Sequence, residues 1–413
     1  MSKRKMKDSG VEWLGEIPAE WDVDRIGSFY QHRNEKVSDK GYAPLSVTMK
    51  GVVPQLETAA KSDDGDNRKL VRKGDFAINS RSDRRGSCGI SFYDGSVSLI
   101  NTILTPRGQM DPCYYNWLFH TQAFADEYYK WGHGIVDDLW TTRWSEMKRI
   151  SIPRPTLSAQ RKIAEYLDAR CAKIDEMVSD AKKTIEEYKA WKASVIFESV
   201  TGKNTGSKMK DSGVEWIGRM PDGWRVIPVR YLLVEKNVRS EAGLEEPLSM
   251  SQVHGVVPSK MITVANPASS YVGAKVVSVG DLVFNKLKAH LGVFAISRYA
   301  GLVSPDYAVY QSRGICDMSL LMWAFHTPQC ISEFKKNVTG IGAGLSRLYT
   351  SDLYRIKVPV PSVEEQLRLV DFLAKKCAAI DRVIAGKEAL MADLEAYKKS
   401  LIFECVTGKM EVA

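Results

Sequence analysis

The 413-residue chain lacks the features of exported and membrane proteins. Its basic start, MSKRKMKDSG, is followed by charged and turn-forming residues, where a signal peptide would need an apolar core. The longest apolar runs, such as Leu320 to Phe325, are far too short to span a bilayer. The seven cysteines are scattered, odd in number and without a CxxC pair, a pattern typical of reduced thiols. We therefore expect a cytoplasmic protein without a membrane partner, a disulfide framework or a zinc site.

Motifs for catalysis are also missing. No G-x-x-x-x-G-K-[ST] loop is present to cradle a nucleotide phosphate, which argues against an ATP motor. The stretch NPAS at Asn266 begins like the Asn-Pro-Pro-aromatic motif of amino-methyltransferases, but it lacks the second proline and the aromatic residue. The six histidines have no metal-ligand spacing, and no acidic cluster indicates a nuclease. We expect no catalytic residue, no metal site and no bound cofactor in this chain.

What the chain does contain is an internal repeat. The nine residues KMKDSGVEW begin at Lys5 and return at Lys208, a shift of 203 residues. GVVP at Gly51 reappears at Gly255, and FESVTGK near the middle of the chain is answered by FECVTGK near its end, with a shift that settles at 206. The chain is therefore a tandem duplication of about half its length.

Each half predicts a short arm, a mixed region and a long helical tail. The mixed regions carry β-rich runs such as GDLVFNK and one amphipathic helical pattern each, YYNWLFHTQAFADEYY and LLMWAFHTPQCISEF. We expect an α+β fold with two globular heads and two long helices. The expected segments are a first arm at 1–24, a first head at 25–155, a first helix at 156–203, a second arm at 204–227, a second head at 228–361 and a second helix at 362–413.

The tails show the heptad spacing of helices that pack side by side. Their apolar positions are Leu167, Cys171, Ile174, Val178, Ala181, Ile185, Tyr188 and Val195, and then Leu373, Cys377, Ile380, Ile384, Met391, Leu394 and Leu401. Lys192, Lys387 and Lys398 interrupt the pattern. Ser362 to Glu365 form a capping box, Thr156 is the matching cap of the first helix, and VTGK ends both helices with a glycine.

A helix from Thr156 to Thr201 is about 69 Å long at about 1.5 Å per residue, and its single apolar seam needs a partner. The obvious partner is its own duplicate, packed antiparallel so that a pseudo-twofold axis relates the halves. In the alternative, each helix folds back on its own head. The antiparallel arrangement predicts two heads held at a fixed separation by a coiled-coil spacer.

These repeated segments resemble the specificity subunit of type I restriction-modification systems. The resemblance lies in the arms DSGVEWLGEIPAEWDV and DSGVEWIGRMPDGWRV, the junctions ISIPRPTLSAQRKIAEYLDARCAKID and VPVPSVEEQLRLVDFLAKKCAAID, and the two VTGK endings. It spans essentially the whole chain, in the same order and twice.

The resemblance implies two target-recognition domains that each read one half of a split site in double-stranded DNA. It also implies a subunit without catalysis of its own, which two methyltransferase subunits bind and to which restriction and translocation subunits are added. S-adenosylmethionine, ATP and magnesium would then belong to the partner subunits. The 58 Lys and Arg against 50 Asp and Glu, a formal charge of +8, permit a polyanionic partner without proving one.

Two pairs of loops are candidate DNA readers, because cations suit phosphates and forked or planar donors suit base edges. The loop NSRSDRRGSCG in the first head and its repeat NKLKAHLG in the second occupy equivalent places in the fold. Their sequences differ, as those of readers of unlike half-sites should. Their candidate residues are Asn79, Arg81, Arg84, Arg85, Asn285, Lys286, Lys288 and His290. The alternative is a solvated turn whose charges aid solubility.

The second pair of loops, WGHGIVDDLWTTRW and TGIGAGLSRLY, precedes the long helices, and their glycines permit close approach to a ligand. Their candidate residues are His133, Arg143, Trp144, Arg347 and Tyr349. Arg347 lies in the Gly-rich loop of the second head alone, so Arg347→Ala is expected to affect one half-site only. Burial of Trp140 and Trp144 in the head is the alternative to DNA contact.

Other functions remain open from the sequence. The four repeated arm residues Trp13, Trp21, Trp216 and Trp224 suit either a partner subunit or the helix bundle. Purified chain that cleaves or methylates DNA unaided would indicate an enzyme. A structural coiled-coil adaptor would bind protein only, and salt-sensitive, sequence-selective DNA binding would argue against it.

Overall fold

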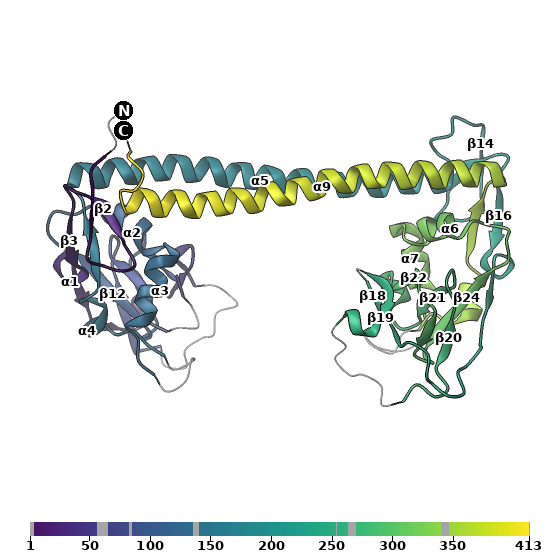
Figure 1. Ribbon diagram of the computed structural model, residues 1–413, viewed down its shortest axis with the longest axis horizontal. Coiled ribbons are helices and arrows are strands. Elements are labelled where there is room, and N and C mark those ends of the chain that lie inside the picture. The colour runs from purple at the N-terminus through teal and green to yellow at the C-terminus, as the bar shows by residue number, and fades with distance from the viewer. Residues whose placement is uncertain are drawn as a thin grey trace. The chain divides into compact units, whose positions relative to one another are not determined.

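The computed structural model describes residues 4–55, 65–81, 85–134, 140–252, 254–262, 270–339 and 347–412. The chain divides into two compact units (Figure 1). Unit 1 comprises Met1–Lys182 and Glu388–Ala413, and unit 2 comprises Lys183–Lys387. Each long helix therefore contributes to both units, whereas the six-segment division remains a prediction. Among the residues described, none of the helices combines the length and the apolarity that a membrane span requires.

Unit 1 contains a head of antiparallel sheets and short helices. Its four-stranded sheet has the order β10 (Cys88–Ile90), β9 (Phe76–Asn79), β12 (Asn101–Pro106), β4 (Tyr30–Arg33). Smaller sheets are β11 (Gly95–Val97), β8 (Arg68–Val71) and β5 (Lys36–Val37); β6 (Leu45–Thr48) and β7 (Gly51–Pro54); β3 (Asp22–Arg25) and β13 (Ser151–Arg154); and β1 (Met6–Asp8) and β2 (Glu16–Pro18). The short helices are α1 (Ile26–Phe29), α2 (Pro112–Phe119), α3 (Gln122–Lys130) and α4 (Trp144–Met147).

Unit 2 builds its head in the same way. The four-stranded sheet has the order β17 (Leu233–Glu235), β24 (Tyr307–Ser312), β21 (Leu282–Asn285), β22 (Phe294–Ile296). The smaller sheets are β20 (Lys275–Val277) and β23 (Gly301–Val303); β18 (Leu248–Ser251) and β19 (Gly255–Pro258); β16 (Arg225–Pro228) and β25 (Lys357–Val360); and β14 (Met209–Asp211) and β15 (Arg219–Pro221). The helices are α6 (Met318–Phe325), α7 (Pro328–Lys336) and α8 (Thr350–Leu353), with 3-10 turns at Val229–Tyr231, Ser259–Met261 and Ala289–Leu291.

The predicted amphipathic helix of each head is in fact two helices. In unit 1 the chain leaves α2 after Phe119, and Thr121 caps α3 by accepting a hydrogen bond from the Phe124 amide at 3.2 Å. In unit 2 Thr327 caps α7 in the same way, and Pro328 follows at the first helical position. The apolar pattern continues through both corners, so hydrophobicity alone did not reveal them.

The core of each head lies between the four-stranded sheet and this helix pair. In unit 1 Phe119 packs at 5.0 Å from the ring of Phe76 and at 4.5 Å from that of Phe124. In unit 2 Phe284 and Phe294 stack at 4.4 Å, and Phe325 meets both rings edge-on. These aromatic clusters hold the sheet fixed, so the loops at the strand ends leave it from defined positions.

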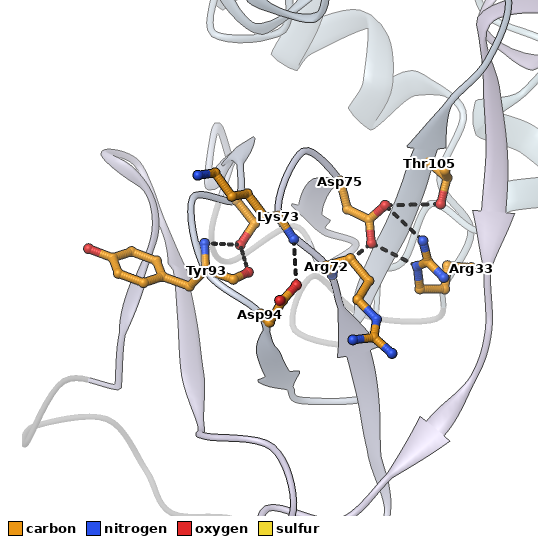
Figure 2. A network of polar contacts seen from close by, with 8 residues as sticks. Arg33, Arg72, Lys73, Asp75, Tyr93, Asp94 and Thr105 are labelled. Atoms are coloured by element: carbon orange, nitrogen blue, oxygen red, sulfur yellow. Dashed lines mark hydrogen bonds and ion pairs between the residues drawn. The ribbon is translucent and has the colours of Figure 1, made fainter.

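A buried aspartate holds the turn before the central strand of each sheet. Asp75 is 2% exposed and accepts hydrogen bonds from Arg33 at 2.7 Å, from Thr105 at 3.0 Å and from the Arg72 amide at 2.9 Å (Figure 2). Asp281 is its counterpart in unit 2. The Asp281 carboxylate accepts from Lys236 at 2.8 Å, Gln311 at 3.2 Å and the Ser278 amide at 2.8 Å.

The two predicted long helices are present as α5 (Leu157–Thr201) and α9 (Val363–Val406). Within unit 1 the first part of α5 and the last part of α9 lie antiparallel and side by side (Figure 1). The heptad prediction holds for the seam residues that are buried: Leu167, Cys171, Ile174, Val178, Ala181 and Ile185 in α5, and Leu373, Cys377, Ile380 and Leu401 in α9. The predicted capping box is also present, because the Ser362 amide donates to Glu365 at 3.2 Å.

The arm tryptophans hold the ends of the helices. Gly408 follows α9 with a φ of +72°, and a Cβ there would lie 2.5 Å from Pro18 and 2.9 Å from Trp21. Gly202 follows α5 with the same φ and equally close neighbours in Pro221 and Trp224. Trp21 and Trp224 therefore pack against helix ends inside their own units, which is one of the two roles that the sequence left open for the four arm tryptophans.

Candidate nucleic-acid interface

In unit 1 the first predicted loop begins where β9 ends. Asn79 is 5% exposed, and its Oδ1 accepts a hydrogen bond from the Arg81 amide at 2.9 Å. Asn79 therefore shapes the turn instead of facing solvent as a reader. The Thr142 amide donates to the Ser80 carbonyl at 2.9 Å, and Arg81 forms a β-bridge with Thr141. This pairing brings the two predicted loops of the head together.

An open groove of about 350 Å³ lies at this junction. Arg81 comes from the first loop, and Arg143 and Trp144 come from the second. The groove is completed by His32 of β4 and Lys69 of β8, two residues that the sequence analysis missed. The His32 ring stacks on the Trp144 indole with centroids 6.0 Å apart and an interplanar angle of 27°.

The groove is positively charged. Lys69 donates to the Asn101 carbonyl at 2.7 Å, and burial lowers the pKa of its ammonium group. Burial, together with the Lys69 charge, also lowers the pKa of His32, so the imidazole is neutral at pH 7. No carboxylate occurs among the described residues that line the groove. Its side walls thus offer two guanidinium groups, one ammonium group and a flat aromatic surface.

The remaining predicted residues of unit 1 lie outside this groove or outside the described residues. The Arg85 guanidinium lies over the Tyr129 ring at 3.6 Å and 4.0 Å from Asp126, so it packs on α3. His133 is exposed and forms a β-bridge with Thr141. Arg84 falls in the segment 82–84, outside the described residues. Trp140 donates to the Tyr129 carbonyl at 3.0 Å, which supports its structural interpretation.

In unit 2 the same loops meet, with different side chains. Asn285 again shapes the turn, because its Oδ1 accepts from the Leu287 amide at 3.1 Å. The Leu348 amide donates to the Lys286 carbonyl at 3.0 Å, so Lys286 and Arg347 lie in neighbouring segments. The Arg347 guanidinium lies 3.9 Å from a carboxylate oxygen of Asp306.

Three further charged residues, missed in the sequence analysis, join this site. Lys275 is 3% exposed and forms an ion pair with Glu235 at 3.3 Å. Burial, followed by the charges of Lys275 and Arg347, lowers the pKa of Lys286, whereas Glu235 and Asp306 oppose that effect. Unit 2 therefore carries three cations and two carboxylates in one cluster.

The other predicted residues of unit 2 lie beside this cluster. Lys288 is exposed at the start of the 3-10 turn Ala289–Leu291, which packs against α7. His290 is half-buried within that turn, and its Nδ1 has no hydrogen-bond partner among the described residues. Tyr349 is 44% exposed at the N-cap of α8, the position that Arg143 holds before α4.

Strand register fixes which residues of the two heads correspond. His32 pairs with Leu104 and Glu235 pairs with Tyr310, so His32 and Glu235 occupy one position. The shift of 206 aligns β8 with β20, so Lys69 and Lys275 are equivalent residues of the two heads. The same shift matches Ser80 with Lys286, Ile100 with Asp306 and Thr141 with Arg347. Apart from the two lysines, each of these matched positions thus carries a different side chain in the two heads.

The described residues contain no group of three or more His, Cys, Asp or Glu side chains placed to hold a metal ion. The exposed donors of the groove and the cluster instead suit binding to a polyanion with acceptor-rich edges.

No family model matches the chain. It is 24% identical to the type I restriction enzyme MjaVIII specificity subunit of Methanocaldococcus jannaschii, over 96% of this chain and 94% of that one. It is 22% identical to the protein assigned as the MjaX specificity subunit of the same organism, over 97% of this chain and 96% of that one. These similarities confirm the resemblance seen in the repeated arms, junctions and VTGK endings.

Solved structures give the same result for the fold. A chain solved in work on the complex assembly and conformational transition of the type I R-M system matches with a TM-score of 0.72 at 14% identity, over 95% of this chain and 99% of that one. The HsdS subunit from Thermoanaerobacter tengcongensis matches with a TM-score of 0.57 at 16% identity, over 95% and 98%. The expected α+β heads and long helices are thereby confirmed.

Proposed function

We propose that this chain, which is similar over its whole length to type I specificity subunits, is the DNA-recognition subunit of a type I restriction-modification complex. Each head would read one half of a bipartite target in double-stranded DNA. The observation that carries the proposal is the charged site that both heads build at the same place, from β4 or β17, β8 or β20 and the two loops. The frame is repeated and the side chains differ, as two unlike half-sites require.

The groove of unit 1 has the chemistry of a major-groove reader. Arg81 and Arg143 are exposed, and a guanidinium group can donate two parallel hydrogen bonds to the O6 and N7 atoms of guanine. Lys69 suits either a phosphate or a base acceptor. The groove walls come from strands and from loops tied to strands, so these donors are preorganised before DNA arrives.

The long helices would dock two methyltransferase subunits and, through them, the restriction subunits. Large apolar side chains are exposed on α9 in unit 2, among them Leu367 at 61%, Phe372 at 44% and Val383 at 39%. Exposed apolar side chains on a helix whose other face is already buried favour a protein partner. Trp191 of α5 is 45% exposed, and the Lys376 ammonium group lies over its ring, 4.6 Å from the ring centroid.

Catalysis would belong to the partners. The chain has no phosphate-cradling glycine loop and no amino-methyltransferase motif. S-adenosylmethionine, ATP and magnesium would therefore bind to the methyltransferase and restriction subunits, in the cytoplasm, where the DNA is. A structural coiled-coil adaptor without DNA specificity is the alternative. It accounts for α5 and α9 but gives no reason for a groove in unit 1 whose described residues carry three cations and no carboxylate.

Methylation mapping tests the proposal. The chain would be co-expressed with its cognate methyltransferase subunit in a host that lacks other adenine methylation, and modified bases would be mapped across the genome. A split motif with two unlike halves and a fixed unspecified gap is expected. A stable copurified complex that leaves no methylation and binds DNA without sequence preference would support the adaptor instead.

A further inference from the structure

The two charged sites differ at the position of His32 in unit 1 and Glu235 in unit 2, beside a lysine that both sites share. Lys69 and Lys275 are equivalent lysines on equivalent strands; Lys275 is buried and Lys69 is half-buried. Beside Lys275 stands Glu235, whose carboxylate lies 3.3 Å from the ammonium group. Beside Lys69 stands His32, which is neutral at pH 7 and supplies no counter-charge. The equivalent lysine is thus paired with a carboxylate in unit 2 and, among the residues that the structure describes, with none in unit 1.

The rest of each site extends this difference. In unit 1 the described residues lining the groove include Lys69, Arg81 and Arg143 and no acid. In unit 2 Lys275, Lys286 and Arg347 share their site with Glu235 and Asp306. Lys69 has a carbonyl but no carboxylate as partner among the described residues, and desolvating a cation in that state is costly, so acceptors from a ligand would stabilise the groove of unit 1.

One further observation indicates that the groove faces a ligand. The His32 Nε2 atom is buried and has no hydrogen-bond partner among the described residues. The ring is held in place by its stack on Trp144, at the wall of the groove. Buried polar atoms are almost always satisfied. An unpartnered ring nitrogen beside three cations, with no carboxylate among the described groove residues, is therefore a place where a bound group would complete the contacts.

We propose that the residue at position 32 or 235 sets the class of DNA group that each head reads. With histidine there, the groove of unit 1 takes a group that only accepts hydrogen bonds, either the O6 and N7 edge of a guanine or a backbone phosphate. With glutamate there, the site of unit 2 presents acceptors among its donors, and so reads a base pair through an amino group, such as the N4 of cytosine, as well. This inference rests on the proposed function.

The test exchanges the two residues in the complete chain, bound to its methyltransferase subunits. His32→Glu would neutralise Lys69 from within and place a negative charge in the groove. We expect it to weaken binding at one half-site by about tenfold or more, because a good base contact contributes about that discrimination, and to leave the other half-site unchanged. Glu235→His should affect only that other half-site. His32→Gln, a neutral replacement, is the matched control for charge: it removes the ring without adding a carboxylate, and should weaken binding less than His32→Glu.

Two further experiments distinguish a guanine from a phosphate as the group bound in the groove of unit 1. Lys69→Met removes the ammonium and keeps most of the stem. If the groove reads guanine, the loss of binding caused by Lys69→Met is confined to one base position, and a 7-deazaguanine at that position gives the same loss. If it grips a phosphate, binding weakens on all sequences, the slope of log K against log salt falls by about one, and a methylphosphonate at one position gives the same loss.

The outcomes also separate this inference from the proposed function. Wild-type complex without sequence preference would overturn both. Selective wild-type binding with His32→Glu unchanged, or with His32→Gln as damaging as His32→Glu, would overturn this inference alone. Hydrogen exchange over the four-stranded sheet of the mutated head shows whether that head is folded, because the two heads belong to separate compact units and one can be damaged alone.

Discussion

The ammonium group of Lys398 donates to both carboxylate oxygens of Asp175, at 2.6 and 2.7 Å. These two residues lie on α9 and α5 within unit 1. The repeat-related pair, Lys192 and Asp381, makes the same two contacts at 2.7 Å within unit 2. Two of the three lysines that interrupt the apolar seam, Lys192 and Lys398, therefore make charged contacts between antiparallel helices, at equivalent points of the two units.

These ion pairs are expected to specify register more than to add stability. Lys398 and Asp175 are partly exposed, at 25% and 64%, so a double-mutant cycle should give a coupling of about 0.5 kcal/mol. Asp175→Lys should destabilise the chain by placing like charges together, and adding Lys398→Asp should restore most of the loss. Urea unfolding of the four variants measures this. Failure of the double reversal to rescue would show that the pair does not set the alignment.

Loss of the buried aspartate should damage one unit strongly. Asp75→Ala leaves Arg33 without its carboxylate and opens the turn before β9, so the free energy of unfolding is expected to fall by about 3 kcal/mol. Asp281→Ala is the matched variant in unit 2, where Lys236 would lose its partner. Urea unfolding and hydrogen exchange would locate each loss. Equal loss of protection in both units for either variant would contradict the assignment of the network to one head.

The glycine that follows α9 should tolerate no side chain. Gly408→Ala combines a left-handed backbone with a Cβ 2.5 Å from Pro18, whereas Gly206→Ala has a similar φ and nothing within 4 Å. Gly206→Ala is expected to cost about 1 kcal/mol from the backbone alone, and Gly408→Ala clearly more. Thermal unfolding of both variants distinguishes the backbone strain of a positive φ from the steric clash of the added Cβ with Pro18. Equal shifts in the melting temperature would mean that Pro18 moves aside easily.

The stability of unit 1 should fall as the pH drops below neutrality. Burial and the Lys69 charge lower the pKa of His32 in the folded protein below its ordinary value. The unfolded chain therefore binds the proton first, so stability is lost as the pH falls through about 6.5 and below. Urea midpoints measured from about pH 7.5 to about pH 5 should show a smaller decline for His32→Gln than for wild type. Parallel declines would indicate that His32 does not titrate differently on folding.

Much of the frame followed from the sequence, because duplication and heptad spacing are local or periodic signals. The repeat, the two long helices, the Ser362 capping box and the terminal glycines were all readable in this way. The corner at Thr121 was missed, since the apolar pattern runs through it without a break. Periodicity reports which face is buried and does not report where a short helix stops.

The candidate site was predictable only in part. Arg81, Arg143 and Trp144 were identified from loop composition, and the structure brings them to one groove. His32 and Lys69 lie on strands far from those loops in the sequence, and their meeting depends on sheet pairing that spacing does not reveal. The recurrence of lysine at the aligned positions 69 and 275 was the available signal. Asn79 and Asn285, which resembled readers, turn inward to shape their loops.

The buried aspartate has a consequence for how such a protein can change. Asp75 and Asp281 hold the same turn through a backbone amide, yet one takes its charged partner from an arginine and the other from a lysine. The turn thus survives replacement of the surrounding side chains. Substitutions at the strand ends can therefore change what each head recognises while the turn that supports the sheet keeps its hydrogen bonds.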